Sequence, residues 1–220
     1  MTADFVEWSF EESLRRLGVD GIDIFYVHNP EFELGIVAYE KLIDKFGKIS
    51  KMLESKRKDG KLGRYGVASW NGFLNDPSNM EYLSLYDFVA ASKVHGDGFG
   101  FVQMPYNPAK PHGYIFANQK IDGEFLPAFY AAQKLGVNVV TSSSLLQMNI
   151  FKKAFSAQFR DICELSLASD LQRALQFARS NPLVSSALVG VSSEEHAEHD
   201  FTILKEGIVA AKYYENFFRL

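Results

Sequence analysis

The chain has 220 residues, of which 47% are hydrophobic and 23% are charged, and its formal net charge is −4 at pH 7. These fractions are typical of a globular protein and exclude a disordered or fibrous chain. A mildly acidic chain lacks the basic stripe that binds a phosphate backbone, so we expect no nucleic-acid partner. The single cysteine, Cys163, excludes an intramolecular disulfide and a cysteine-rich metal site, and its apolar-rich segment favours a small buried hydrophobe.

The sequence also bears on location and domain organisation. The first residues lack the basic and then apolar pattern of a signal peptide, and no apolar run approaches the roughly 18 residues that span a bilayer. We therefore expect a cytoplasmic protein without a membrane partner. No linker, low-complexity tract or short repeat divides the chain, which predicts a single domain over residues 1–220.

Helical patterns and short apolar strands alternate along the first half of the chain. Apolar residues recur at helical spacing up to Leu17, and Gly18 ends that helix because glycine adopts the left-handed cap conformation at little cost. The elements predicted for this half are a helix at 4–17, a strand at 22–27, a helix at 36–57, a strand at 64–68, a helix at 81–93 and a strand at 99–104.

The same alternation continues to the end of the chain. The predicted elements are a helix at 125–135, a strand at 137–141, a helix at 171–179, a strand at 185–190, and helices at 194–205 and 209–218. Strands alternating with helices of this length predict βα units and a parallel sheet of about five strands. Two longer connections, 107–124 and 145–168, each follow the carboxyl end of a strand, where parallel α/β folds build their sites.

Polar side chains follow four of the five strands at the point where each apolar run stops. They are His28 with Asn29, Ser69 with Asn71, Gln103, and Ser142 with Ser143 and Ser144. Any one of them has a simpler explanation as a polar cap on a buried strand, but together they predict a binding rim. An imidazole titrates near neutral pH, so His28 is the best candidate for proton transfer, although a lone strand-terminal histidine is more often structural.

Other motifs have weaker functional interpretations. Ser192 and Ser193 open a helix whose N–H groups suit a phosphate, but helix capping explains them without a ligand. His196 and His199 lie three residues apart on that helix, and without a third ligand this pattern favours a solvated face over a metal site. The glycine-rich stretch 96–100 precedes a strand and predicts a turn.

At four segments the sequence resembles the aldo-keto reductase family. They are residues 12–30, which end in the histidine, and residues 60–70, 102–108 and 187–196. Each segment alone is weak, but their order and spacing match along almost the whole chain. The family folds as an eight-stranded TIM barrel and reduces carbonyls with NADPH, or sometimes NADH. The resemblance therefore implies an α/β fold that is a partial TIM barrel, an oxidoreductase activity, the cofactor NADP(H) or NAD(H), and a small carbonyl substrate.

The resemblance also assigns residue roles. His28 would be the catalytic histidine that orients the substrate carbonyl, while Ser69 and Gln103 would hydrogen-bond the nicotinamide carboxamide. Ser142 stands where many members place a tyrosine that stacks on the nicotinamide. Residues Gly190, Ser192, Ser193 and His196 would approach the adenosine phosphate. No arginine or lysine stands in 190–196 to pair with a 2′-phosphate, so the choice between the two cofactors stays open.

The resemblance begins just before the family's fourth strand, so we expect the first three βα units to be absent. With them would go the family's catalytic aspartate, tyrosine and lysine, of which the tyrosine is the general acid. Losing a positioned acid typically removes about 10²–10⁴-fold in rate. Tyr26 and Tyr106 lie near strand ends but have no evident lysine partner, so neither is assigned this role.

Five strands cannot close a barrel of the eight-strand size, which would leave open sheet edges. These edges predict that the chain is a fragment of a longer protein, pairs with a complementary N-terminal half, associates with itself, or shields its sheet with the terminal helices. Activity of the chain alone is therefore open. The alternatives are a non-catalytic reductase-like binding or assembly module, and one half of a split or truncated enzyme.

Overall fold

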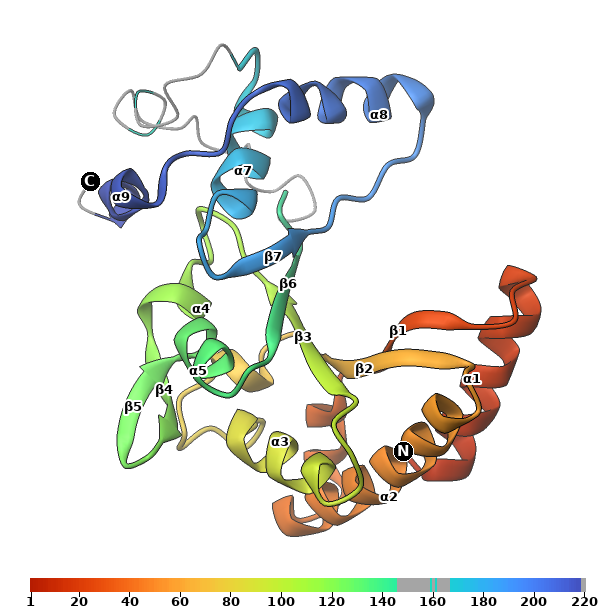
Figure 1. Ribbon diagram of the computed structural model, residues 1–220. Coiled ribbons are helices and arrows are strands. Elements are labelled where there is room, and N and C mark those ends of the chain that lie inside the picture. Colours follow the sequence, from red (N-terminus) through yellow and green to blue (C-terminus); the bar gives the residue numbers. More distant parts are fainter. Residues whose placement is uncertain (146–158, 160, 162–166, 219–220) are drawn as a thin grey trace. The chain divides into compact units, whose positions relative to one another are not determined.

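A computed structural model (Figure 1) describes residues 1–145, 159, 161 and 167–218. The chain divides into two compact units, which are described separately. The first unit comprises Met1–Met104 and Gly113–Val139, and the second comprises Pro105–His112 and Val140–Leu220. A single domain over 1–220 stays a prediction. Cys163 and most of the 145–168 connection lie outside the described residues.

The first unit is built from βα elements in chain order. They are α1 (Ala3–Leu17), β1 (Ile22–His28), the 3₁₀ helix η1 (Pro30–Gly35), α2 (Tyr39–Lys58), β2 (Leu62–Ala68), η2 (Gly72–Leu74), α3 (Leu85–Lys93), β3 (Phe99–Pro105), α4 (His112–Ile115), β4 (Ala117–Ile121), β5 (Glu124–Pro127) and α5 (Ala128–Lys134). Helix α2 packs against α1, α3 and β2 (Figure 1). The predicted elements at 4–17, 22–27, 64–68 and 99–104 are confirmed to within one or two residues at each end.

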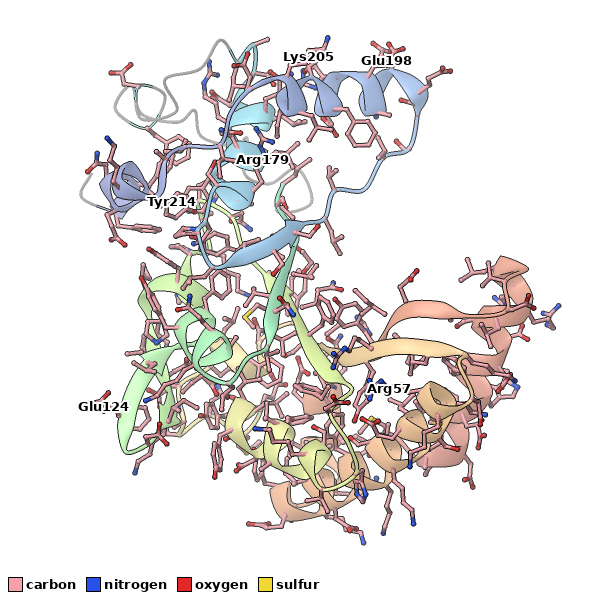
Figure 2. The ribbon with its side chains drawn as sticks, viewed as in Figure 1. Arg57, Glu124, Arg179, Glu198, Lys205 and Tyr214 are labelled. Carbon is pink, nitrogen blue, oxygen red and sulfur yellow. The ribbon has the colours of Figure 1, made fainter. Side chains whose placement is uncertain are left out.

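The second unit comprises the segment Pro105–His112 and the chain from Val140, within β6, to the C-terminus. Its elements are β6 (Asn138–Ser142), α7 (Asp170–Arg179), β7 (Val184–Ala187), α8 (Glu194–Phe201), η4 (Thr202–Lys205), α9 (Ala211–Tyr214) and η5 (Glu215–Phe218). The Arg179 side chain, labelled in Figure 2, donates to the carbonyls of Ile203 and Glu206 at 2.8 and 2.7 Å. It thereby ties α7 to the end of η4.

The central sheet has five strands in the order β1-β2-β3-β6-β7, and β1, β2 and β3 pair in parallel. This confirms the predicted α/β fold of about five parallel strands alternating with helices. Strand β2 approaches β3 closely at Gly66, where an added Cβ would lie 2.0 Å from the carbonyl oxygen of Phe101. Only glycine fits this register, which therefore depends on a single residue.

Each unit has its own aromatic core. In the first, the buried ring of Phe88 lies 4.5 Å from Phe46 and 5.7 Å from Phe73, measured between ring centroids. In the second, the ring of Phe177 lies 5.1 Å from Tyr106 and 5.2 Å from Phe217. The many aromatic residues of the sequence therefore fill two cores.

Four predicted boundaries are wrong, and the first in the chain is the start of the helix predicted from residue 36, which begins at Tyr39. Residues 125–127 belong to strand β5, which pairs with β4, and the helix begins only at Ala128. Asp122 and Gly123 have φ values of 51° and 89°, so they form the two-residue turn that favours a hairpin. The strand predicted to reach Gly190 ends at Ala187, and the helix predicted from 81 begins at Leu85.

No described helix combines the length and the apolar character of a membrane span.

Candidate functional site

The carboxyl ends of β1, β2 and β3 lie at one edge of the sheet in the first unit. His28 is in register with Ala68, and Ala68 is in register with Gln103. The next main-chain bond continues this pattern, because the Ser69 N–H donates to the Gln103 carbonyl at 2.9 Å. The structure therefore brings His28, Ser69 and Gln103 to neighbouring positions, while their chemical roles stay predictions.

His28 is the last residue of β1, and its side chain is exposed. Asn29 follows with a left-handed φ of 47°, and Pro30 begins η1, so the chain turns away from the sheet directly after the histidine. His28 also lines a cavity of about 450 Å³ within the first unit. Most of the other side chains around this cavity are apolar, and they include Phe5, Phe25, Tyr26, Phe32 and Ile36. The imidazole is thus accessible at the border of an apolar hollow.

Tyr26 lies two residues before His28 and lines the same cavity. Burial raises the pKa of its phenol to about 12. A neighbouring cation would have the opposite effect, because it favours the ionised phenolate. The environment of Tyr26 therefore differs from that of an acid activated by lysine, which agrees with leaving it out of the predicted catalytic residues.

Glu31 joins the ends of β1 and β2, and the sequence analysis did not single it out. Its side chain is 1% exposed. One carboxylate oxygen, Oε1, accepts hydrogen bonds from the Ser69 hydroxyl at 2.8 Å and from the Trp70 N–H at 2.8 Å. The N–H groups of Asn71 and Gly72 point to the same oxygen at 3.3 and 3.5 Å. An acidic residue after a strand end is common in loops, so no sequence signal separated this one from a solvated carboxylate.

The contacts of Glu31 restrict what Ser69 can do. The Ser69 hydroxyl gives its proton to Glu31 and accepts the Gly72 N–H at 2.8 Å. A serine hydroxyl has one proton and two lone pairs, so only acceptor capacity remains. Gln103 is half-buried, and its side-chain amide contains both a donor and an acceptor. Of the two residues predicted to hold a carboxamide, Gln103 fits better.

In the second unit, Ser142 ends β6 and its side chain is half-buried. Its carbonyl accepts the Tyr106 N–H at 3.0 Å. The next residue, Ser143, has a φ of 54°, and the Ser144 hydroxyl donates to the Leu188 carbonyl at 3.0 Å. Ser142 therefore lies at a sharp turn at a strand end, as predicted, but a serine offers no ring for stacking.

The start of α8 contains the remaining predicted residues, Gly190, Ser192, Ser193 and His196, and all four are exposed. The Ser193 hydroxyl accepts the His196 N–H at 3.2 Å, which confirms the capping interpretation. Glu194 and Glu195 occupy the first turn. Their carboxylates complement the helix dipole but repel a phosphate. This end of α8 is therefore a poorer phosphate site than the two serines predict.

The paired histidines of α8 contact nearby polar groups, and His199 Nε2 also lies 3.4 Å from the Ser169 hydroxyl at the start of α7. His199 Nδ1 lies 3.3 Å from the Asp200 carboxylate, and His196 Nδ1 lies 3.3 Å from the Ser192 hydroxyl. Across the described part of the chain, no cluster of three or more histidine, cysteine, aspartate or glutamate side chains is placed to hold a metal ion.

The family model described as the Aldo/keto reductase family matches residues 1–214. This match covers nearly the whole chain, and it does not bear out the narrower expectation that the chain resembles only a C-terminal part of the family. No curated protein matches the chain.

Solved structures share the fold at low sequence identity. A thermostable aldo-keto reductase in complex with the inhibitor epalrestat superposes with a TM-score of 0.66 at 16% identity, over 98% of this chain and 66% of that one. An aldo-keto reductase from Bacillus halodurans in its holo form gives 0.64 at 16% identity, over 99% and 65%. One from Klebsiella pneumoniae with NADP and acetate gives 0.63 at 19% identity, over 97% and 64%. The chain thus spans about two thirds of the length of these proteins.

Proposed function

Because the chain belongs to the aldo/keto reductase family, we propose that it contributes the nicotinamide side of an NAD(P)H-dependent carbonyl reductase site. The observation that supports this most directly is the exposed His28 imidazole, at the same sheet edge as Gln103. In α/β folds, residues at the carboxyl ends of parallel strands build such sites.

The residues of the chain have distinct roles in this proposal. His28 donates a hydrogen bond to the substrate carbonyl oxygen and so orients and polarises that carbonyl. Gln103 pairs with the nicotinamide carboxamide as donor and acceptor, and Ser69 contributes at most an acceptor. Ser142 and the 190–196 segment, with Gly190, Ser192, Ser193 and His196, are the proposed cofactor contacts of the second unit. When bound, the reduced nicotinamide supplies a hydride.

We propose NAD(H) as the preferred cofactor. Residues 190–196 contain no arginine or lysine, and Glu194 and Glu195 stand in the first turn of α8. A 2′-phosphate near these carboxylates would be repelled. We expect NADH to bind more tightly than NADPH, and Glu194→Lys to improve the affinity for NADPH about fivefold while leaving that for NADH nearly unchanged. An equal gain for both cofactors, measured by isothermal titration, would contradict this preference.

We propose that the proton donor comes from another chain, such as a complementary N-terminal half, or from residues outside this sequence. Within the described residues, β1 stands at the end of the strand order, and β2 is its strand neighbour. The raised pKa of Tyr26 supports the same proposal, because burial without an activating cation makes this phenol a poor acid. An edge strand presents main-chain groups to which a further strand can pair.

The test compares nucleotide binding and carbonyl reduction in matched variants. We expect NADH binding by the wild-type chain, and a fall of about 10²-fold in kcat/KM in His28→Ala with little change in nucleotide affinity. His95→Ala, at the turn after α3, is the control because it removes an imidazole from the same unit away from the strand ends. A stable, defined oligomer with no affinity for either nucleotide would instead support a non-catalytic assembly module.

A further inference from the structure

Glu31 is a buried carboxylate in the first unit, and its side-chain hydrogen bonds go to residues outside its own 3₁₀ helix. It lies three residues after His28, in the first turn of η1, and its partners belong to residues 69–72. These partners lie 38 to 41 positions after Glu31 in the sequence, so a single side chain links two successive βα turns.

The donors around Glu31 form a cradle for an anion. Three consecutive N–H groups, from Trp70 to Gly72, point to the same carboxylate oxygen, together with the Ser69 hydroxyl. Successive main-chain N–H groups in a turn create a concave site with positive potential. Bonds from such donors to an ionised carboxylate are stronger than bonds between neutral groups. The turn is therefore organised around a negative charge that the chain itself supplies.

The second carboxylate oxygen makes Glu31 sensitive to substitution. Oε2 is buried and has no hydrogen-bond partner among the described residues. A glutamine of the same shape must place its NH₂ group either at this position or against four converging donors. With its NH₂ group at the Oε2 position, the amide oxygen still accepts the four donors, but the NH₂ group is then buried with no acceptor among the described residues, and the negative charge that strengthens the four bonds is lost.

We propose that Glu31 is a positioning residue, which fixes the 69–72 turn after β2 against the segment after β1 and thereby sets the strand-end geometry around His28 and Gln103. This inference rests on the proposed function, because the geometry that Glu31 sets is the one that would receive the nicotinamide. Glu31 acts through the turn and does not touch the cofactor or the substrate.

The first experiment measures the turn without any nucleotide. In the wild-type chain, the amides of Trp70, Asn71 and Gly72 should exchange slowly with solvent, and in Glu31→Ala their exchange should accelerate at least about tenfold. Acetate has the shape of the deleted carboxylate end, so it should restore protection, whereas chloride at equal ionic strength should not. Glu33→Ala removes a carboxylate from the same 3₁₀ helix without touching the turn and should leave these amides protected.

Trp70 offers a second measurement of the same turn. The chain has two tryptophans, and in a Trp8→Phe background Trp70 is the only remaining one. Its side chain is 38% exposed. We expect Glu31→Ala to change the quenching of its fluorescence by acrylamide, and acetate to reverse the change. If Glu31→Ala fails to fold, Glu31→Gln serves the same measurement and should show faster exchange that acetate does not reverse, because the amide fills the site.

The second experiment adds NADH and NADPH. We expect the Kd for the preferred nucleotide to rise about tenfold in Glu31→Ala and to recover with acetate, while Glu33→Ala binds as the wild type does. Restored affinity distinguishes positioning from a general loss of stability, because acetate acts only at the vacated carboxylate site.

The outcomes separate the two proposals. If the wild-type chain binds neither nucleotide, the proposed function fails, and the anchoring of the turn is still decided by amide exchange. Unchanged protection of residues 70–72 in both Glu31 variants would overturn the anchoring. Lost protection together with unchanged nucleotide affinity would overturn the positioning role and leave the proposed function intact.

Discussion

The two units of the chain fix their polar interiors in different ways. The first buries the carboxylates of Glu31 and Glu54, which are 1% and 4% exposed. The centre of the second unit contains neutral groups, namely the hydroxyls of Tyr106 and Tyr214 and the amide of Asn181. A buried carboxylate requires several hydrogen-bond donors around it, whereas each buried neutral group needs only one partner for each of its donors and acceptors. Both units therefore have aromatic cores, but the first also fixes its turns with buried carboxylates, whereas the central hydrogen bonds of the second join neutral groups and its buried carboxylate, Asp200, lies on α8 beside His199.

Glu54 shows what a charge-based anchor requires. One of its carboxylate oxygens accepts the Gly98 N–H at 2.7 Å and the Tyr65 hydroxyl at 3.2 Å, and the other accepts from Arg57 at 2.7 Å. Arg57, labelled in Figure 2, also donates to the Gly63 carbonyl at 2.8 Å. A Cβ at position 98 would lie 2.6 Å from the carboxylate, so the anchor depends on a glycine as well.

The second unit contains a directional chain of neutral hydrogen bonds. The Tyr214 hydroxyl donates to the Phe177 carbonyl at 2.7 Å, so the Tyr106 hydroxyl must donate to Tyr214, 2.9 Å away. Tyr106 in turn accepts from the Asn181 amide at 2.9 Å. This series of hydrogen bonds ties α9 to the aromatic core, and each of the two hydroxyl protons has one acceptor.

The largest expected effect tests the aromatic side of the comparison. Phe177 is 1% exposed and packs against the rings of Tyr106, Tyr214 and Phe217. Phe177→Ala should lower the free energy of unfolding by about 4 kcal/mol, because it leaves a cavity that these rings fill only in part. Urea titration measures the change. Phe201→Ala, at a ring that is 52% exposed, is the control and should cost far less.

Removing the buried charge should have the next largest effect. Glu54→Ala should cost about 3 kcal/mol, because it leaves the Gly98 N–H and one Arg57 contact without their acceptor in a buried site. Asp97→Ala removes the other carboxylate paired with Arg57, but that side chain is 86% exposed, so its loss should cost less than about 0.5 kcal/mol. Equal costs for the two variants would show that burial does not strengthen the carboxylate anchor of the first unit.

A smaller effect tests the series of neutral hydrogen bonds through Tyr106 and Tyr214. Tyr214→Phe retains the ring and removes one hydroxyl, so the Tyr106 hydroxyl and the Phe177 carbonyl each lose a partner. We expect a loss of about 1–2 kcal/mol in the free energy of unfolding. Combining it with Tyr106→Phe should cost less than the sum of the two single changes, because both act on the same bonds. Strict additivity in a double-mutant cycle would show that the hydroxyls act independently.

The sequence predicted the elements well where one signal dominated. Helix α1 has a capping threonine, a periodic apolar face and a C-terminal glycine, and its predicted span differs from the observed one by a single residue. The prediction was wrong at 125–127, where Phe125 and Leu126 fit an apolar helix face equally well. The Asp122–Gly123 turn decided that region instead. Turn chemistry two residues away therefore outweighed the local apolar pattern.

For the candidate site, the sequence predicted which residues lie at the strand ends but not how their protons are used. The placement of His28 and Gln103 follows from the parallel sheet alone. The engagement of Ser69 by Glu31 does not, because it joins residues 38 positions apart through a side chain with no periodic signal. Hydrogen-bond partners over such a separation depend on the tertiary structure, so a sequence pattern can identify a site and still misjudge its donors.

The smallest expected effect is a difference in acid sensitivity between the units. Lys45 lies 2.6 Å from Glu33, and this contact, together with the amino group of Met1, lowers the pKa of Glu33 below its usual 4.5. A group with a lowered folded pKa stabilises the folded state above its unfolded pKa, and that contribution is lost as the pH falls through the folded value. Below about pH 4.5 we therefore expect the first unit to lose up to about 1 kcal/mol from this pair, since the side chain is 18% exposed and partly screened.

Both tryptophans, Trp8 and Trp70, belong to the first unit, so their fluorescence follows that unit during an acid titration. Amide exchange around Tyr214 follows the second, whose central hydrogen bonds contain no group that titrates between pH 3 and 7. Glu33→Gln should reduce the acid dependence of the tryptophan signal and leave the exchange around Tyr214 unchanged. A different outcome would be that both units lose protection at the same pH in the wild type and in the variant. A shared unfolding transition would then govern the chain. The kind of anchoring in each unit would in that case have no consequence for stability in acid.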